Sequence, residues 1–247
     1  MADERWLDGL VALVTSAGRG ELGGGGAGIA RALASHGAQV VVNDVTEELV
    51  AATVGQIQQR GGIAWGIAGD VSAPQDAQRM VDATVEHFGR IDILVNNAAL
   101  GGLVPAVEHL PDEVWQRQVA IDLSGPFFMS RAALRHMVPR RFGRIVNIGS
   151  LAGVRTGFVS GAPYTTAKSG LIGLTRQMAL EFAPTGSPST CSCPPESATR
   201  RSCDGARIFS RDETIRSDRS IPKVSLASWS RSSAGGIPDS SPEQRSR

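Results

Sequence analysis

Three side chains of this sequence have types and spacing that suit proton transfer: Ser150, Tyr164 and Lys168. Tyr164 and Lys168 are four residues apart, so on a helix they would share one face. Tyr164 is the only tyrosine in the chain, and Ser150 follows a run, residues 144–148, that is typical of a strand. An ammonium beside a phenol favours the phenolate, which is the form that accepts a proton. The trio therefore indicates acid–base chemistry on an alcohol or carbonyl, although Tyr-x-x-x-Lys pairs also occur on ordinary amphipathic helices.

A second group of candidates lies in a glycine-rich segment after the apolar run at residues 10–15. Glycines between a strand and a helix let the backbone approach a pyrophosphate at the positive end of that helix. The candidate contacts in this segment are Ser16, Gly18, Arg19, Gly20, Gly24 and Gly26. Asp44 ends the next apolar run, where a carboxylate can bind both adenosine-ribose hydroxyls and repels a 2′-phosphate. We therefore expect a dinucleotide site that prefers NAD, with Arg19 as a weaker signal for NADP.

The elements that must position these residues alternate between strand and helix patterns, as in βαβ units. Strands are expected at 10–15, 39–43, 63–68, 91–95 and 144–148, and helices at 29–35, 47–60, 74–88, 112–138 and 162–182. Gly125-Pro126 predicts a kink in the longest helix. The pattern predicts an α/β fold with a doubly wound, Rossmann-type parallel sheet. Ligands of such sheets bind beyond the carboxyl ends of the strands, where Ser150 and Asp44 would lie.

In this order the motifs resemble the short-chain dehydrogenase/reductase family over about residues 7–186. The matching motifs after the glycine loop are Asp44, Asp70-Val71, Asn96-Asn97-Ala98-Ala99, Ser150-Leu151-Ala152-Gly153 and Tyr164-Thr165-Thr166-Ala167-Lys168. The resemblance implies that Tyr164 donates or accepts the proton, Lys168 holds the nicotinamide ribose and Ser150 orients the substrate oxygen. It also implies a cofactor-binding role for four further residues. Asp70 and Val71 would lie at the adenine, and Asn97 and Ala98 along the adenosine.

The activity implied by the resemblance is hydride transfer between NAD(H) and a secondary alcohol or ketone. Reduction of a ketone leaves negative charge on its oxygen, which needs a hydrogen-bond and proton donor in place. Two other functions stay open. One is reduction of 3-oxoacyl thioesters with NADP(H), and the other is a non-catalytic remnant that binds the dinucleotide only. Turnover with simple ketones would separate the enzymes from the remnant.

The glycine loop departs from the family pattern. Counted back from the following helix, the family's closing Gly-x-Gly falls on Gly24 and Gly26, but counted forward from Thr15 it begins at Gly20. The loop is thus about four residues longer, and Ser16 stands at the place of the first glycine. We expect a reshaped phosphate site rather than a lost one.

The second departure is Asp122, at the position of a catalytic asparagine. In the family, the main-chain carbonyl of that asparagine helps to hold a proton-relay water, and aspartate keeps this carbonyl. The charge of Asp122 is new and would further stabilise a protonated Lys168 if the two lie close together. We assign Asp122 a catalytic-support role, against the alternative of an exposed helical carboxylate.

The third departure is the segment 187–247, which is rich in Ser, Arg and Pro and lacks any apolar period. Family members continue here with Gly-Ile-x-Val-Asn-x-Val and a Pro-Gly turn. Joining the third base of each codon to the first two of the next, from Gly186 to Glu196, permits Ile, Thr, Val, Asn and Val, then two further residues, and then Ser or Pro, Pro and Gly. The Pro-Gly turn thus comes one residue later than in the family. We infer a shift of reading frame after Gly186. The expectation is a catalytic domain at 1–186, a disordered tail at 187–247, and a sheet that lacks its last strands or a chain that folds poorly.

Composition narrows the class of partner. The formal net charge of +1 offers no basic field for nucleic acid, and no apolar run reaches the length of a membrane span. The first residues carry no signal-peptide pattern, which predicts a cytoplasmic enzyme. Cys191, Cys193 and Cys203 have no histidine at ligand spacing, so no metal is expected. The helical patterns at 112–138 and 162–182 suit a homo-oligomer, because the family often pairs these helices across a dimer face.

Overall fold

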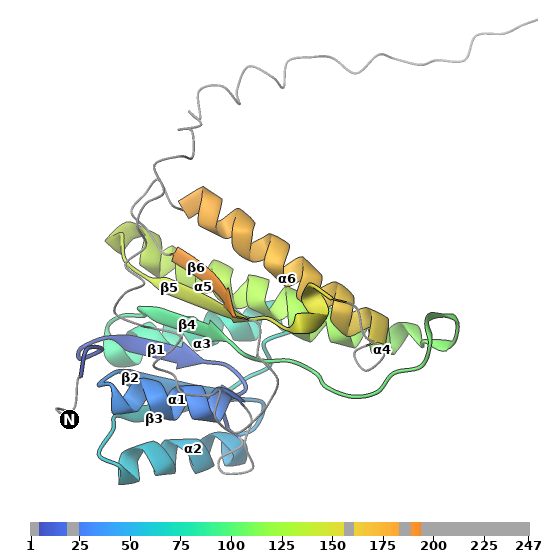
Figure 1. Cartoon of the computed structure of the whole chain (residues 1–247). Helices are drawn as coiled ribbons and strands as arrows, with labels where there is room; N and C mark the ends of the chain where they lie inside the picture. Colours follow the sequence, from blue (N-terminus) through green and yellow to red (C-terminus); the bar gives the residue numbers. More distant parts are fainter. Residues whose placement is uncertain (1–4, 19–24, 156–160, 183–188, 194–247) are drawn as a thin grey trace, which may run out of the picture. The chain divides into compact units, whose positions relative to one another are not determined.

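A parallel sheet forms the middle layer of the computed structural model, which describes residues 5–18, 25–155, 161–182 and 189–193 (Figure 1). In these residues the strand order is β3-β2-β1-β4-β5-β6, and every neighbouring pair is parallel. The strands are β1 (Val11–Val14), β2 (Gln39–Asp44), β3 (Ala64–Ala68), β4 (Ile93–Asn96), β5 (Arg144–Ile148) and β6 (Ser189–Cys193). The chain crosses from β3 to β4 on the far side of β1, so the sheet is doubly wound, as the sequence predicts.

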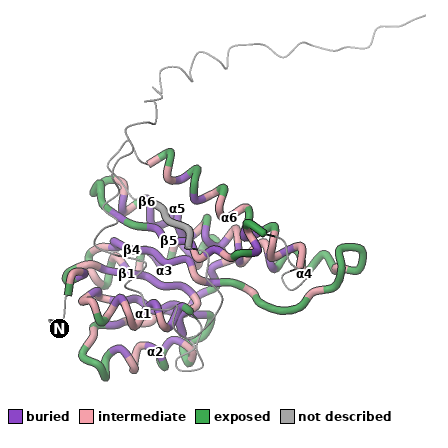
Figure 2. Tube along the Cα trace, viewed as in Figure 1, coloured by how far each residue is buried: buried purple, intermediate pink, exposed green. Residues whose placement is uncertain are grey.

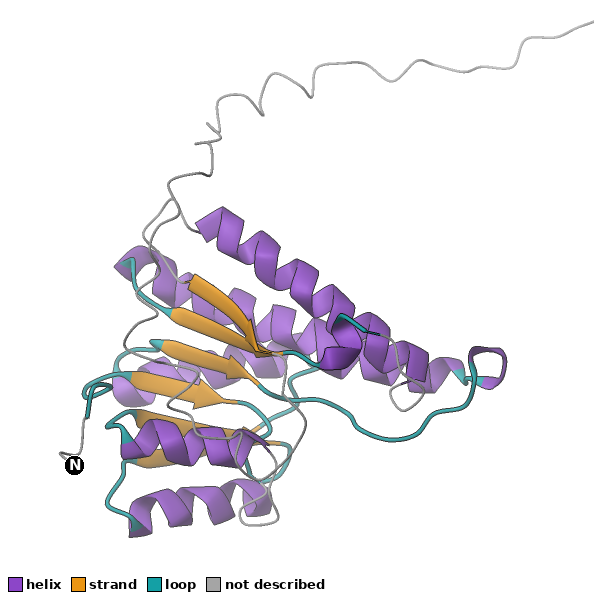
Figure 3. Cartoon of the chain, in the orientation of Figure 1, coloured by secondary structure: helices purple, strands orange, loops and turns teal. Residues whose placement is uncertain are grey.

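Helices cover both faces of this sheet (Figure 3). They are α1 (Gly25–Ser35), α2 (Glu47–Gln59), α3 (Pro74–Phe88), α4 (Asp112–Val119), α5 (Gly125–Arg140) and α6 (Gly161–Phe182). One apolar core lies between the sheet and α1 and α2, and the other lies between the sheet and α3, α5 and α6. Within β1, Leu13 belongs to one core and Val14 to the other, which explains why the central strands are buried on both faces (Figure 2). All these elements belong to one unit of the chain.

The longest predicted helix is interrupted in the structure. Between α4 and α5 the chain makes a π-helical turn, η3 (Ala120–Ser124), which directly precedes the Gly125-Pro126 pair that predicted a kink. Pro126 has no N–H to donate to the carbonyl of Asp122 four residues earlier, so the α-helical ladder fails there. Such turns are frequent at functional sites. η3 contains Asp122.

The expectation that the sheet ends at β5 is wrong. β6 continues the parallel sheet beside β5, in a register that pairs Arg144 with Ser189 and Ile148 with Cys193. Strand pairing uses backbone N–H and C=O groups that every residue but proline carries, so it does not require an apolar pattern. Without β6 the outer edge of β5 would leave those groups unpaired. The predictions for residues 194–247, including any seventh strand, lie outside the described residues.

Candidate active site

The end of β1 is fastened to the end of β4 by one side chain, Thr15. Its Oγ1 accepts hydrogen bonds from the N–H groups of Asn97 (3.0 Å) and Ala98 (3.1 Å), and donates to the Val95 carbonyl at 3.3 Å. The Asn97 side-chain amide in turn donates to the carbonyls of Thr15 and Ser16, both at 3.1 Å. The predicted contacts Ser16, Asn97 and Ala98 therefore lie together at the carboxyl edge of the sheet.

The first turn of α1 packs closely against this junction. A Cβ on Gly26 would collide with the Ser16 carbonyl oxygen and with Asn97 Nδ2, so only glycine fits there. Ser16 itself has a φ of 49°, in the left-handed region that glycine adopts most easily. Glycine would adopt this backbone conformation without strain, in agreement with the glycine that the resemblance implies at this position. The first turn of α1 holds no acidic residue, which leaves the positive end of the helix suited to a phosphate. Arg19, Gly20 and Gly24 lie outside the described residues.

Asp44 reaches back to the same loop from the end of β2. The residue is 6% exposed; its Oδ2 accepts from the Gly18 N–H at 3.0 Å and its Oδ1 from the Val45 N–H at 2.9 Å. A Cβ on Gly18 would lie 2.6 Å from the carbonyl carbon of Leu49, so this approach also requires glycine. Each carboxylate oxygen can accept a second hydrogen bond. Asp44 therefore keeps acceptor capacity for hydroxyl groups of a ligand.

Asp70 and Val71 follow β3, next to Asp44. The Gly69 N–H donates to the Asp44 carbonyl at 2.9 Å, which joins the two strand ends. Asp70 is exposed, and its Oδ1 accepts from both the N–H (2.8 Å) and the hydroxyl (2.7 Å) of Ser72. Val71 is buried in the core. Of this predicted pair, only Asp70 presents a polar side chain at the surface.

Ser150 begins the turn that follows β5. It is the N-cap of η4 (Leu151–Gly153), and its hydroxyl oxygen accepts from the Ala152 N–H at 3.2 Å. The same turn is joined to α6, because Ser169 Oγ donates to the Gly153 carbonyl at 3.0 Å. The strand end that carries Ser150 is thus attached to the helix that carries Tyr164 and Lys168.

Lys168 is the buried centre of this cluster. Its side chain is 2% exposed, and Nζ donates to the Ile148 carbonyl at the end of β5 at 3.0 Å. Nζ lies 5.6 Å from the centroid of the Tyr164 ring, one turn earlier on α6, and 3.6 Å from Asp122 Oδ2. The structure therefore brings together Tyr164, Lys168 and Asp122, and the condition that Asp122 lies close to Lys168 is confirmed.

Asp122 is fully buried, and besides facing Lys168 it binds the segment that follows β4. Its Oδ1 accepts from the Leu100 N–H at 2.9 Å, while Gln118, one turn earlier on the helix, donates to the Leu100 carbonyl at 3.1 Å. These two bonds fix the segment that leaves β4. Asp122 Oδ2 has no hydrogen-bond partner within the described part of the chain.

Burial shifts the acid–base balance of both members of this pair. It raises the pKa of the Asp122 carboxyl, an effect that the Lys168 charge and the Leu100 N–H oppose. Burial likewise lowers the pKa of Lys168, and the Asp122 charge opposes that shift. Each group therefore depends on the other to stay charged in a buried setting.

Sequence reasoning missed three parts of the site: the Thr15 hydroxyl, the Gln118 amide and the Ile148 carbonyl. Gln118 had a signal, because a polar residue four positions before Asp122 lies on the same helix face. Thr15 and Ile148 act at strand ends through partners far away in the sequence, which no local pattern reports.

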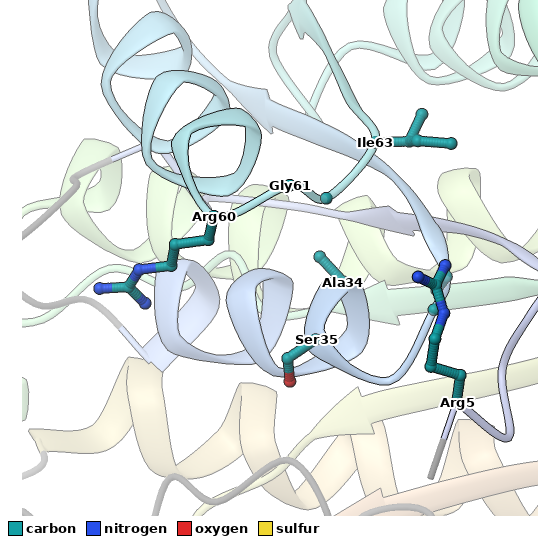
Figure 4. Close-up of a pocket in the computed structure, with 9 residues that line it drawn as sticks. Arg5, Ala34, Ser35, Arg60, Gly61 and Ile63 are labelled. Carbon is teal, nitrogen blue, oxygen red and sulfur yellow. The ribbon is translucent and has the colours of Figure 1, made fainter. Parts of the chain in front are cut away.

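A separate pocket of about 160 Å³ lies at the opposite end of the sheet (Figure 4). Its walls come from the ends of α1 and α2, including Ser35 and Arg60, from the residues that lead into β2 and β3, and from Arg5 ahead of β1. Those are the amino ends of the strands, whereas Asp44, Asn97 and Ser150 stand at the carboxyl ends. The pocket therefore is not part of the candidate active site.

No group of three or more His, Cys, Asp or Glu side chains among the described residues could hold a metal ion. No helix in this described part of the chain is long and apolar enough to cross a membrane.

Comparison with known proteins identifies the family. Residues 10–203 match the short chain dehydrogenase family, so this chain belongs to it and is an oxidoreductase. A relative from Thauera aromatica, (2S)-[(R)-hydroxy(phenyl)methyl]succinyl-CoA dehydrogenase subunit BbsD, is 38% identical over 184 residues, which are 74% of this chain and 71% of the relative. The D-beta-hydroxybutyrate dehydrogenase of Cupriavidus necator is 39% identical over 190 residues, or 76% and 70% of the two chains.

Solved structures agree on the fold. NAD+-bound xylitol dehydrogenase has a TM-score of 0.70 and 32% identity, covering 76% of this chain and 70% of its own. A metagenomic short-chain oxidoreductase in complex with NADP has a TM-score of 0.74 and 34% identity, covering 82% and 89%. These two neighbours bind different cofactors.

Proposed function

We propose that this chain transfers a hydride between NAD(H) and a secondary alcohol or ketone, with Ser150, Tyr164 and Lys168 as its catalytic residues. One observation carries the proposal: the buried Lys168 ammonium lies under the Tyr164 ring and is held by the Ile148 carbonyl at the carboxyl edge of the sheet. A buried lysine in this place has a chemical use, because it favours the phenolate form of the tyrosine. A purely structural lysine would be expected at the surface.

The residues at this edge fit a dinucleotide. Gly26 allows a close backbone approach to Ser16 and Gly18 a close approach to Leu49, and the first turn of α1, from Gly25 on, holds no acidic residue. Asp44 has acceptor capacity for ribose hydroxyls and would repel a 2′-phosphate, which favours NAD; Arg19 favours NADP more weakly. Asp70, Asn97 and Ala98 would line the adenosine. The bound nicotinamide supplies or accepts the hydride.

The protein's own residues handle the proton. During reduction, negative charge develops on the carbonyl oxygen, and the Tyr164 hydroxyl donates its proton there while the Ser150 hydroxyl donates a hydrogen bond to the same oxygen. The carbonyl carbon has gained the hydride, so the ketone becomes an alcohol. Oxidation runs the same steps in reverse, with Tyr164 as the base. Asp122 supports the site through its main-chain carbonyl, which Pro126 leaves without an α-helical partner.

A second candidate is reduction of 3-oxoacyl thioesters with NADP(H). The names of the relatives favour it: the Thauera protein acts on a hydroxyacyl-CoA, and a Streptomyces virginiae relative, 41% identical over 187 residues, is called a putative ketoacyl reductase. A remnant that binds cofactor without turnover is the third candidate, because the inferred frame shift would replace residues after Gly186.

The deciding experiment follows NADH and NADPH oxidation with a simple ketone, with acetoacetate and with acetoacetyl-CoA. The proposal expects NADH-dependent turnover of a ketone; NADPH-dependent turnover of the thioester alone would favour the second candidate. A matched chain with the reading frame shifted by one base after codon 186 is assayed in parallel. If only the frame-shifted chain turns over a substrate, the sequence as it stands is a non-catalytic remnant.

A further inference from the structure

Lys168 and Asp122 form an ion pair that is buried on both sides. Their side chains are 2% and 0% exposed, and Lys168 Nζ lies 3.6 Å from Asp122 Oδ2. No other ion pair of Lys168 occurs among the described residues, and its one hydrogen bond there goes to the Ile148 carbonyl. A buried ammonium with only a neutral partner would be strongly disfavoured.

The orientation of the Asp122 carboxylate is set independently of Lys168. Oδ1 is fixed by the Leu100 N–H at 2.9 Å, and Oδ2 is left facing the ammonium without a hydrogen bond in the described structure. Since 3.6 Å is too long for a direct hydrogen bond, Oδ2 acts on Lys168 through its charge. An asparagine at this position could keep the bond to Leu100 but could not supply the charge.

Few other charged groups face this pair. From α6, Lys168 faces Asp122 in η3 and has Tyr164 beside it. From α4 comes the uncharged Gln118, and from β5 the Ile148 carbonyl. The exposed arginines of the helices packed against η3 form no ion pair with Asp122 or Lys168 in the described part of the chain; they are Arg117 on α4, Arg131, Arg135 and Arg140 on α5, and Arg176 on α6. The charge of Lys168 is therefore governed locally by Asp122.

We propose that Asp122 is a positioning residue that keeps the buried Lys168 charged and thereby sets the upper pH limit for proton transfer by Tyr164. The second half of this proposal rests on the proposed function, and the first half does not. Without the carboxylate, the Lys168 ammonium would be buried with the Ile148 carbonyl as its only hydrogen-bond partner among the residues that the structure describes. It would then lose its proton at a lower pH.

The chain offers a direct spectroscopic test, because Lys168 and Lys223 are its only lysines. Protein labelled with ¹³C at lysine Cε gives two signals, assigned with Lys223→Arg, and each is titrated against pH in the wild type and in Asp122→Asn. We expect the Lys168 midpoint to fall in Asp122→Asn while the Lys223 midpoint stays fixed. An unchanged Lys168 midpoint would overturn the proposal. A Lys168 signal that is already neutral at pH 7 in the wild type would also overturn it, whether or not the variant folds.

A kinetic arm tests the second half. The alkaline fall of kcat/KM should begin at lower pH in Asp122→Asn and should not move in Asp82→Asn, which removes the same charge from the surface of α3. An identical alkaline limb in Asp122→Asn and the wild type would overturn the link to proton transfer. If the NMR midpoint moves but no chain shows turnover, the ion pair stands, and the proposed function and the kinetic half both fail.

Discussion

Asn97 donates a hydrogen bond from its side-chain amide to the carbonyl oxygen of Ser16 at 3.1 Å. This bond fixes Ser16, whose φ of 49° suits glycine better than serine. The hydrogen bond anchors the strand end while the serine Cβ is strained by the left-handed backbone.

Ser16→Gly should therefore stabilise the protein by about 0.5–1 kcal/mol, because the relief of strain exceeds the added freedom of the unfolded chain. Urea unfolding followed by circular dichroism measures the change. Ser16→Ala is the matched control, since it removes the hydroxyl and keeps the strain. A Ser16→Gly protein less stable than the wild type would contradict the strain argument.

Tyr164→Phe should lower kcat by about a hundred-fold or more, because the phenol is the proposed proton donor. The phenyl ring still lies over Lys168, so NADH binding should stay within a few-fold. Steady-state kinetics and fluorescence titration with NADH give the two numbers. Retention of more than a tenth of the activity would show that another group moves the proton.

Wild-type protein should bind NADH more tightly than NADPH, because the Asp44 carboxylate repels a 2′-phosphate. In Asp44→Asn the preference should shrink, since the amide oxygen can still accept from one backbone N–H but the charge is gone. Calorimetric titrations with both cofactors test this. Tighter NADPH binding by the wild type would mean that Arg19 outweighs Asp44.

Asp76, in the first turn of α3, should stabilise the protein only above acidic pH. The hydrogen bond from the Asp70 N–H, and then Arg79, hold the pKa of its carboxyl below the ordinary value. A carboxyl whose pKa is lowered by folding contributes stability above its unfolded pKa, about 3.9, and loses it as the pH falls through the folded pKa. Wild type should thus be more stable than Asp76→Asn at pH 7, and the difference in the free energy of unfolding should shrink as the pH falls below the unfolded pKa and through the lower folded pKa. If the wild type stayed more stable than Asp76→Asn in acid, the stabilisation would come from packing or hydrogen-bond geometry rather than from the Asp76 charge.

Shortened chains can test the contribution of β6. A chain that ends after Cys193 should unfold cooperatively at a higher temperature than one that ends after Gly186, because β6 pairs the outer edge of β5. Thermal melts followed by circular dichroism compare the two. Equal midpoints would show that the pairing contributes nothing to stability.

The fold and the cluster around Tyr164 could be predicted because both depend on local patterns. Continuous apolar runs marked the buried strands, and the four-residue spacing placed Tyr164 and Lys168 on one helix face. The proximity of Asp122 to Lys168 was only a condition in the sequence analysis, and the structure meets it. The assigned roles of Ser150, Tyr164 and Lys168 remain predictions.

Other features depend on partners that the local sequence does not specify. Thr15 bonds to residues about eighty positions away, and the Gln118 amide recognises a backbone carbonyl. β6 was missed because its pairing with β5 relies on backbone groups, which amino-acid composition does not reveal. The π-helical turn was missed because Gly125-Pro126 predicts a break in the helix but does not specify its geometry.

That turn also fixes the phase between two halves of one long helix. A residue added to an α-helical path rotates everything after it by about 100° about the axis. η3 lets Gln118 and Asp122 face Leu100 while α5, which follows without a loop, points Met129 and Ala133 into the core. Deleting one residue within Ala120–Ser124 would allow a straight α-helix, but the core face of α5 and the face that meets Lys168 could then no longer both be in place.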